Sequence, residues 1–393
     1  MKNAKTLARI ALSALIRVLL LPLCLLPIRK NRVLFVSYRG KQYSCSPRAI
    51  SEALEKMSGG EIEIGWAFHR PQDFETLTAR GIRVLDDRSF AFVVYALTAR
   101  VICTNAYYKP FLPRRRGQFF LRTWHGGGAY KRVGRAEKLP APHRFYIRMQ
   151  QQGASLYTSS SEAFTRMTLR EAFDYRGEVL ETGLPRNDAL LDEAARNEAA
   201  RRARAALGLS ENVRLALYAP TWRDDRIRAH QIDFARLKAA LSARFGGEFR
   251  VLFRGHYITD GNGSASFGDV DATQYPDMQD LLAASDVLVT DYSSCMWDMS
   301  LIFRPVFLYC TDLNTYRADR DFFTDIRTWP FPVSETNDEL EQTILRFDED
   351  AYREAVRRHH RELGSCETGH AARDAAARIY FCLLYTSPSP RDA

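Results

Sequence analysis

The sequence has 393 residues, a formal net charge of +9 and seven cysteines. This length exceeds what one hydrophobic core usually serves, so we expect two domains. The cysteines are odd in number and show no paired spacing such as Cys-x-x-Cys, which argues against a zinc or disulfide framework and for reduced thiols. About ten Lys and Arg residues precede Glu52, the first acidic residue, and the rest of the chain is close to neutral. A nucleic-acid-binding domain would carry a basic face, so we expect no nucleic-acid partner and predict contact with a membrane surface.

Residues 1–30 are predicted to form a membrane-associating segment. A helix over 2–17 places its polar residues along one stripe: Lys2, Lys5, Arg9, Ser13 and Arg17. Its apolar face is predicted to carry Leu7, Ile10, Ala11, Ala14, Leu15 and Val18. The apolar run 18–28 is about half the roughly twenty residues that a spanning helix needs, so we favour a helix lying in the membrane interface. A single spanning helix, a secretory signal and a helix packed on its own protein are the alternatives.

The remaining chain alternates between apolar strands and helices, which is typical of parallel sheets covered on both faces. The predicted strands of the first half are 32–37, 61–68, 83–85, 100–104, 118–123, 155–159 and 178–182. Those of the second half are 214–218, 249–253, 270–272, 287–289 and 306–309. We therefore predict an α/β protein with two Rossmann-like, doubly wound domains facing a cleft.

The domains are predicted at 31–191 and 208–384, joined by a helix over 192–207. Further helices are expected at 47–57, 234–245, 278–284 and 296–303, and through most of 338–382. Residues 385–393 follow no capping pattern and are expected to be a non-native tail.

The stretch 287–298 shows how a ligand site is predicted to arise. An apolar strand ends at Val289, a polar turn covers 290–294, and a helix continues over 296–302. Ser293 or Ser294 is expected to cap this helix, whose N-terminus would attract a phosphate. An ordinary strand–turn–helix joint with a serine cap is the alternative.

Four other polar clusters follow predicted strands. They are Trp124-His125-Gly126-Gly127-Gly128, the stretch 183–188 with Arg186, the stretch 219–225 with Pro220 and Thr221, and Arg254-Gly255-His256. Each alone is equally typical of a turn, a helix cap or a surface ion pair. Because ligands of open α/β sheets bind at the carboxyl ends of the strands, five such clusters together indicate a binding cleft.

Together these motifs resemble those of the CDP-glycerol glycerophosphotransferase family, which includes the teichoic acid primases and polymerases. The resemblance spans roughly residues 30–330 and rests on 123–126, 182–188, 218–223, 254–256, 285–294 and 304–305. It implies a GT-B-like pair of α/β domains, peripheral association with the cytoplasmic face of the membrane, and a CDP-linked donor.

One motif departs from the family pattern. The family usually has His-Gly-Thr-Pro-Leu, whereas this chain has His125-Gly126-Gly127-Gly128-Ala129. The histidine is retained, but the difference leaves open the identity of the acceptor and of the polyol on the donor.

The resemblance implies transfer of glycerol phosphate from CDP-glycerol to a hydroxyl of a lipid-linked acceptor, with release of CMP. It implies His125 as general base and His256 as the second catalytic residue. The implied substrate-binding residues are Gly126, Gly127, Arg186, Pro220, Thr221, Arg254, Gly255, Asp291, Ser293, Ser294 and Asp298. A CDP-ribitol-using enzyme, a GT-B glycosyltransferase with a nucleotide-sugar donor and a non-catalytic binding protein are the alternatives.

The sequence shows no dedicated metal cage. Asp224-Asp225 would suit Mg²⁺ held together with substrate phosphates, but a solvated acidic turn is the interpretation we favour.

Overall fold

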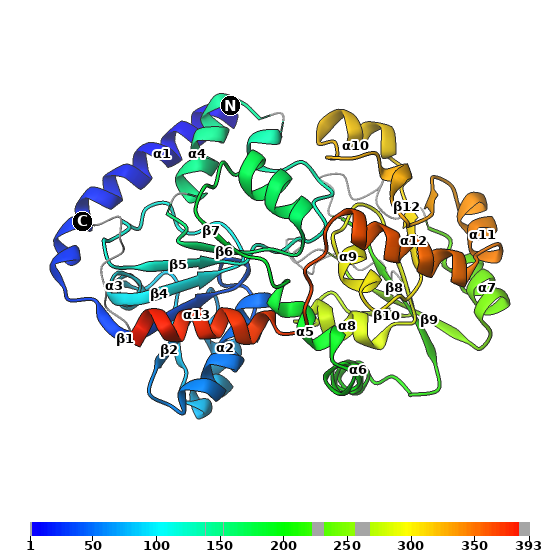
Figure 1. Cartoon of the computed structure of the whole chain (residues 1–393), viewed down its shortest axis with the longest axis horizontal. Helices are drawn as coiled ribbons and strands as arrows, with labels where there is room; N and C mark the ends of the chain where they lie inside the picture. Colours follow the sequence, from blue (N-terminus) through cyan, green and yellow to red (C-terminus); the bar gives the residue numbers. More distant parts are fainter. Residues whose placement is uncertain (1, 138, 152, 222–231, 256–267, 385–393) are drawn as a thin grey trace.

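The computed structural model describes residues 2–137, 139–151, 153–221, 232–255 and 268–384. Two parallel sheets stand side by side, one formed by the first half of the chain and the other by the second (Figure 1). The predicted fold class is confirmed, and all twelve strands predicted from the sequence are present within one to three residues of their expected ends.

The first sheet has the strand order β3-β2-β1-β4-β5-β6-β7, and every neighbouring pair is parallel. Its strands are β1 (Arg29–Val36), β2 (Glu63–Phe68), β3 (Arg83–Asp86), β4 (Ala99–Thr104), β5 (Phe119–Arg122), β6 (Leu156–Thr158) and β7 (Glu178–Leu180). The helices of this half are α1 (Lys2–Leu19), α2 (Cys45–Ser58), α3 (Phe90–Thr98), α4 (Ala141–Gln151) and α5 (Asp188–Leu191).

The second sheet has the order β10-β9-β8-β11-β12-β13 and is also parallel. Its strands are β8 (Arg214–Ala219), β9 (Phe249–Phe253), β10 (Val270–Asp271), β11 (Val287–Thr290), β12 (Val306–Tyr309) and β13 (Val333–Ser334). The two-residue strand β13 was not predicted, because so short a run directly after Pro330 and Pro332 carries no strand pattern. The helices are α6 (Glu193–Ala206), α7 (Phe234–Phe245), α8 (Met278–Ala284), α9 (Cys295–Ser300), α10 (Leu313–Asp319), α11 (Asn337–Leu345), α12 (Glu349–Glu362) and α13 (Ala371–Leu384).

The last helix, α13, returns to the first sheet and packs against α2 (Figure 1). Ala375, Ala376 and Ile379 are fully buried in the same core as Val33 and Phe35 of β1. The core of the first sheet is thus completed by the far end of the chain. The division into 31–191 and 208–384 stays a prediction, and α13 contacts the first sheet although it lies within the second range.

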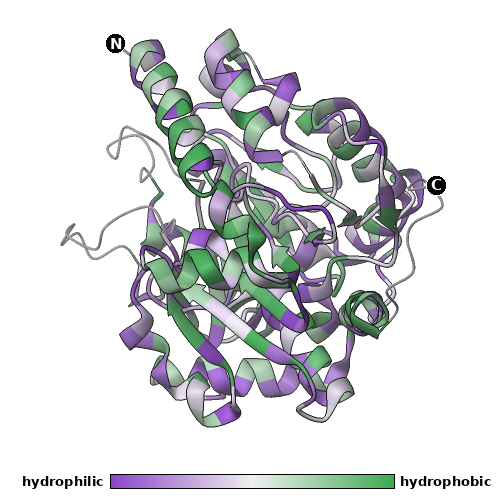
Figure 2. Ribbon diagram, turned by 90° about the vertical axis from the view of Figure 1, so that its left-hand side faces the viewer, coloured by the Kyte–Doolittle hydropathy of each residue, from purple (hydrophilic) through white to green (hydrophobic). Residues whose placement is uncertain are grey.

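Helix α1 lies against α4 (Figures 1 and 2), although Lys5 and Arg9 of its predicted polar stripe are exposed. Thr6 and Ser13 are buried, and Thr6 Oγ1 lies 3.1 Å from His143 Nε2. The opposite side exposes its apolar side chains to solvent, with Leu15 and Val18 about 60% exposed. The helix therefore packs on the protein and also presents an apolar surface, and its contact with a membrane stays a prediction. No helix in the described ranges is both long and apolar enough to cross a membrane.

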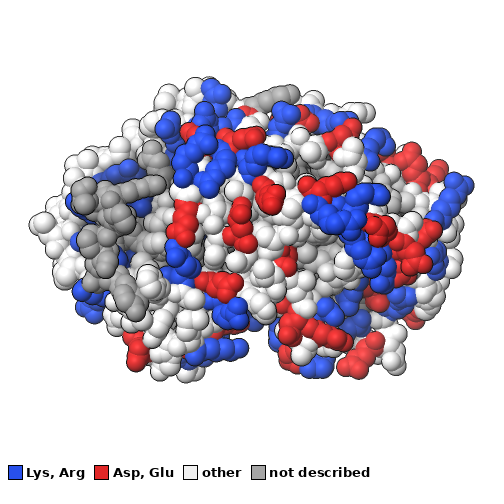
Figure 3. Space-filling model, viewed as in Figure 1, with Lys and Arg blue, Asp and Glu red and all other residues white. Residues whose placement is uncertain are grey.

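Acidic and basic side chains are interspersed over the face shown in Figure 3. Many form surface ion pairs, such as Arg236 with Asp338 (2.6 Å). Pairs of this exposure are each worth about 0–1 kcal/mol, so packing of the two cores dominates the stability of the protein.

We expect Ile379→Ala on α13 to lower the free energy of unfolding by about 2–5 kcal/mol, because it opens a cavity in the first core. Urea denaturation measures this change. The matched control is Phe381→Ala on the same helix, whose side chain is 57% exposed and should change the stability by less than about 0.5 kcal/mol. Equal effects of the two substitutions would contradict the packing of α13.

Candidate active site

A pocket of about 260 Å³ opens between the two sheets at the carboxyl ends of their strands. The segments that follow β1, β5, β8, β9 and β11 all contribute to it. The site residues predicted from the sequence that line it are His125, Gly126, Gly127, Arg186, Pro220, Thr221, Arg254, Gly255, Ser293, Ser294 and Asp298. Asp291 lies just behind the wall, and His256 lies outside the described residues.

His125 stands in the pocket wall as an oriented, neutral imidazole. Its Nδ1 lies 2.8 Å from the backbone carbonyl oxygen of Asn105. A carbonyl oxygen can only accept, so Nδ1 carries the proton and Nε2 keeps its lone pair. Burial lowers the pKa of His125 to about 4, and the positive charges of Arg186, Arg39 and Lys131 add to this effect, although the hydrogen bond with Asn105 opposes it. The ring is therefore a proton acceptor at neutral pH.

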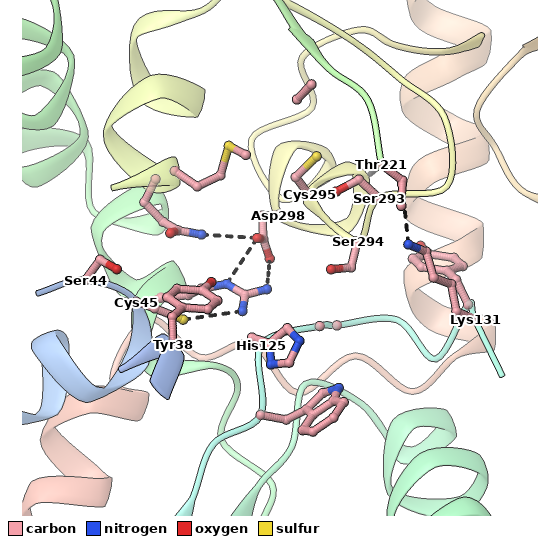
Figure 4. Close-up of a pocket in the computed structure, with 18 of the residues that line it drawn as sticks. Tyr38, Ser44, Cys45, His125, Lys131, Thr221, Ser293, Ser294, Cys295 and Asp298 are labelled. Atoms are coloured by element: carbon pink, nitrogen blue, oxygen red, sulfur yellow. Dashed lines mark hydrogen bonds and ion pairs between the residues drawn. The ribbon is translucent and has the colours of Figure 1, made fainter. Parts of the chain in front are cut away.

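The glycines after His125 allow close packing against α9. A Cβ on Gly127 would come within 2.5 Å of the ring of Trp297, and one on Gly128, at φ +71°, within 2.3 Å of Tyr130. Gly126 faces Ser294, and Figure 4 shows His125 and Ser294 on opposite sides of the pocket. The glycines that replace the larger residues of the family pattern at 127 and 128 thus leave room for the bulky side chain of Trp297.

Arg186 is held by a carboxylate rather than left open for a phosphate. Its Nε and Nη2 donate to the two oxygens of Asp298 at 3.1 and 2.9 Å, and Gln279 Nε2 donates to the same carboxylate at 3.1 Å (Figure 4). Burial would lower the pKa of Arg186, but Asp298 raises it, and the net shift is upward. The two donor atoms that could hold a phosphate are therefore occupied by Asp298 in this structure.

Arg254 is a buried cation of the pocket wall with no carboxylate in contact among the described residues. It is 9% exposed, and Nη1 donates to the carbonyl oxygens of Tyr275 (2.5 Å) and Ala272 (3.4 Å). No carboxylate among the described residues lies within ion-pair distance of it, and burial lowers its pKa. A buried guanidinium in a pocket wall that has no carboxylate in ion-pair contact favours an anionic ligand.

Asp291 positions Thr221. Its carboxylate accepts hydrogen bonds from the Thr221 backbone N–H (2.9 Å) and hydroxyl (2.6 Å) and from the Tyr292 N–H. The Lys131 ammonium donates to the same Thr221 hydroxyl at 3.4 Å. This network ties the turn after β8 to the turn after β11 and brings a further cation to the pocket.

The turn before α9 differs from the prediction. The helix spans Cys295–Ser300, shorter than predicted, and Ser294 occupies the N-cap position without making a side-chain capping hydrogen bond. The helix is too short for a strong dipole, so Ser293 and Ser294 contribute to the pocket as lining residues.

Several lining residues were missed from the sequence, above all those of the loop after β1. The residues missed in this loop include Tyr38, Gln42, Ser44 and Cys45, and Lys131 was missed in the segment after β5. The signal was present, because a Gly- and Ser-containing turn follows the first strand and the carboxyl-end rule applies to it as well. Tyr38 and Cys45 have positive φ angles of 44° and 62°, which is unusual for such residues.

Glu367 lies in the segment before α13, and its role in stabilising the pocket was also missed from the sequence. Its carboxylate accepts hydrogen bonds from Trp297 Nε1 (2.9 Å), Asn187 Nδ2 (3.1 Å) and the Leu184 N–H (3.0 Å). Burial raises the pKa of Glu367 to about 7 despite these hydrogen bonds. The side chain thus joins the C-terminal segment to both halves of the site.

No group of three or more His, Cys, Asp or Glu side chains suited to a metal ion occurs in the described part of the chain. Asp224 and Asp225 lie outside the described residues. The pocket brings together a base, a buried cation and polar donors around one cavity, which is a set suited to transfer of a phosphorylated group.

Comparisons with known proteins agree with this chemistry. Residues 20–380 match the family model of the CDP-Glycerol:Poly(glycerophosphate) glycerophosphotransferases. A teichoic acid poly(glycerol phosphate) polymerase of Bacillus spizizenii is 29% identical over 334 residues, covering 81% of this chain and 84% of the relative. A teichoic acid ribitol-phosphate primase of the same organism is 28% identical, covering 79% and 81%.

The structure of the wall teichoic acid polymerase TagF superposes with a TM-score of 0.79 at 24% identity, covering 98% of this chain and 97% of that chain. This likeness establishes the GT-B-like fold, and the family model spans most of the sequence. The chain is therefore an enzyme of the CDP-glycerol:poly(glycerophosphate) glycerophosphotransferase family.

Proposed function

We propose that this enzyme transfers glycerol phosphate from CDP-glycerol to a hydroxyl of a lipid-linked acceptor and releases CMP. The observation that carries the proposal is the occurrence, in the same pocket, of one oriented, neutral histidine and one buried arginine that has no carboxylate in ion-pair contact among the described residues. The first suits a hydroxyl that must lose a proton, and the second suits a donor that carries phosphate.

In the proposed reaction the acceptor oxygen attacks the phosphorus that bears the glycerol. His125 Nε2 takes the hydroxyl proton as the new P–O bond forms. The bond from this phosphorus to the oxygen of the CMP phosphate breaks, and that oxygen leaves with the electron pair. Catalysis is then mostly positioning and charge stabilisation.

The donor is proposed to lie against the second sheet. Arg254 and Gly255 follow β9, and Pro220 and Thr221 follow β8, so together they would surround the phosphates. Ser293 and Ser294 add hydroxyl groups from the turn after β11, and His256 would add a further cation. Arg186, Asp298 and Asp291 act by holding these segments in place.

The acceptor is proposed to reach His125 from a membrane surface. Helix α1 exposes Leu7, Leu15, Val18 and Leu19 on one side, each by 54–67%, and burying the exposed part of each side chain in the interface would contribute roughly 1–2 kcal/mol. We propose peripheral attachment to the cytoplasmic face, where CDP-linked donors are available.

The experiment is CMP release from CDP-glycerol, with and without a lipid-linked disaccharide, in detergent micelles. We expect acceptor-dependent release from the wild type and a fall of about 10²–10⁴-fold in His125→Ala, because the general base is lost. Circular dichroism and the retained binding of CDP-glycerol control for folding.

Three other donors complete the experiment. Release of CMP from CDP-ribitol but not from CDP-glycerol would mean that the donor carries ribitol instead of glycerol. Reaction with UDP- or GDP-sugars alone would contradict the proposal and identify the enzyme as a glycosyltransferase. Near-normal turnover of His125→Ala would remove this histidine from the mechanism.

The pH dependence follows from the state of His125. The pKa of about 4 lies below the ordinary value of 6.5, so the free enzyme holds this base unprotonated at every pH above about 4. The pH dependence of kcat/KM reports the ionisation of groups in the free enzyme. We therefore expect protonation of His125 to lower kcat/KM only as the pH drops towards 4. A pH–rate profile measures this dependence, and an acid limb near pH 6.5 that belongs to His125 would contradict the assignment.

Arg254 and Arg186 should respond oppositely to the same substitution. Arg254→Gln leaves no carboxylate unpaired, so we expect weaker CDP-glycerol binding with little loss of stability. Arg186→Gln leaves Asp298 buried without its cation and should cost about 3–5 kcal/mol of unfolding free energy. Isothermal titration with CDP-glycerol and urea denaturation separate the two effects, and a stability loss in Arg254→Gln as large as that in Arg186→Gln would be the contrary outcome.

A further inference from the structure

A second cavity, of about 230 Å³, lies on the first half of the protein between α1 and α4. Its walls come from α1, the loop after β4, β5 and the end of α4 (Figure 1). The polar and charged side chains that line it belong to Arg17, Tyr108, Lys109, Arg114, Arg122 and Gln150. None of the residues that line the pocket between the sheets is among them.

The cavity gathers positive charge and no negative charge. Four of its lining residues are Arg or Lys, and none is Asp or Glu. Lys109 is neutralised by Asp87 at 2.8 Å, but Arg17, Arg114 and Arg122 have no carboxylate partner among the described residues. Like charges held together without counter-charge are costly, and the pKa of Arg114 is lowered by burial and by the nearby Arg122.

Buried donors also point to a missing acceptor. Arg122 is 4% exposed, and its Nη2 donates to the Gln150 carbonyl oxygen at 2.6 Å. Its Nε, the Nε of Arg17 and the hydroxyl of Tyr108, which is 8% exposed, are buried without a hydrogen-bond partner among the described residues. Unpaired buried donors each cost about 1–3 kcal/mol, and an anion with several oxygens would satisfy them together.

The position of the cavity limits the kind of anion. Arg17 reaches it from α1, where its Nη2 donates to the Pro110 carbonyl oxygen at 2.5 Å. Its neighbours Leu15, Val18 and Leu19 are exposed on the outer side of the same helix. A helix lying in a membrane interface sits at the boundary between head groups and acyl chains, so the cavity beneath it would lie at the depth of lipid phosphates.

We propose that this cavity binds the phosphate group of a membrane lipid. The proposal rests on the membrane attachment put forward above, and it adds a specific site to the apolar face. Arg17 and Arg122 supply the charge, and Tyr108 supplies a neutral donor.

The test measures partitioning into vesicles of phosphatidylcholine with and without phosphatidylglycerol, by sedimentation. Tyr108→Phe removes one hydrogen bond without changing the charge, and Arg17→Gln removes one charge from the cavity. Arg9→Gln is the matched control, because Arg9 is an exposed residue of the same helix that does not line the cavity. We expect about a tenfold loss of partitioning into phosphatidylglycerol vesicles for each cavity variant, the size of one hydrogen bond to a charged group, and a smaller loss for Arg9→Gln.

Two outcomes would overturn the proposal. Wild-type partitioning by Tyr108→Phe, with equal losses in Arg17→Gln and Arg9→Gln, would mean that surface charge alone attracts the vesicles. Absence of partitioning by the wild type would remove both the lipid site and the membrane attachment, whereas transfer of polyol phosphate is measured in detergent and stands independently.

A further arm separates lipid phosphate from free phosphate. Inorganic phosphate is titrated without vesicles while the thermal midpoint of unfolding is followed in the wild type and in Tyr108→Phe. Stabilisation common to both proteins belongs to the pocket between the sheets. If Tyr108→Phe loses stabilisation by phosphate but partitions normally into vesicles, the ligand is free phosphate and the lipid source is wrong.

Discussion

The pocket between the two sheets depends on a buried ion pair between the two halves of the chain. Arg186 follows the last strand of the first sheet, and Asp298 lies on the helix after β11 of the second. Both side chains are almost fully buried, so their desolvation is offset only by their good geometry and by Gln279. Arg48 with Asp277 forms a second link across the same cleft at 3.2 Å. Because these pairs fix how the sheets face each other, they also fix the distance between the proposed base and the donor phosphates.

Two kinds of cationic side chain therefore surround the pocket, and their partners tell them apart. Arg186 is matched by a carboxylate and acts within the protein, whereas Arg254 is matched only by carbonyl oxygens. The same distinction applies at the second cavity, where Lys109 is paired with Asp87 and Arg122 is not paired with any carboxylate that the structure describes. A cationic side chain that is paired with a carboxylate thus has a structural role, whereas one without such a partner is available to an anionic ligand. This difference separates the two kinds better than exposure or position does.

Local patterns in the sequence predicted most of the fold and many of the residues that line the pocket. The apolar strands and the polar clusters after them carried enough information, because parallel strands share one carboxyl edge. Other features depend on contacts between distant residues. Nothing in the neighbouring sequence indicates that Arg186 pairs with Asp298 or that Glu367 hydrogen-bonds to Trp297. The burial of Ser13 on α1 is likewise not evident from the residues around it. The strand β13 and the positive φ angles of Tyr38 and Cys45 were missed because tertiary packing, not local propensity, imposes them.

The return of α13 to the first sheet has a consequence for synthesis on the ribosome. The strands of that sheet are complete once β7 has been made, but Ala376 and Ile379, which close its core, follow nearly two hundred residues later. At the usual elongation rates this interval is on the order of 10 s or more. Throughout this interval the nascent first half exposes an unfinished apolar face. Its folding is therefore coupled to the synthesis of α13, and chaperones have a defined surface to protect.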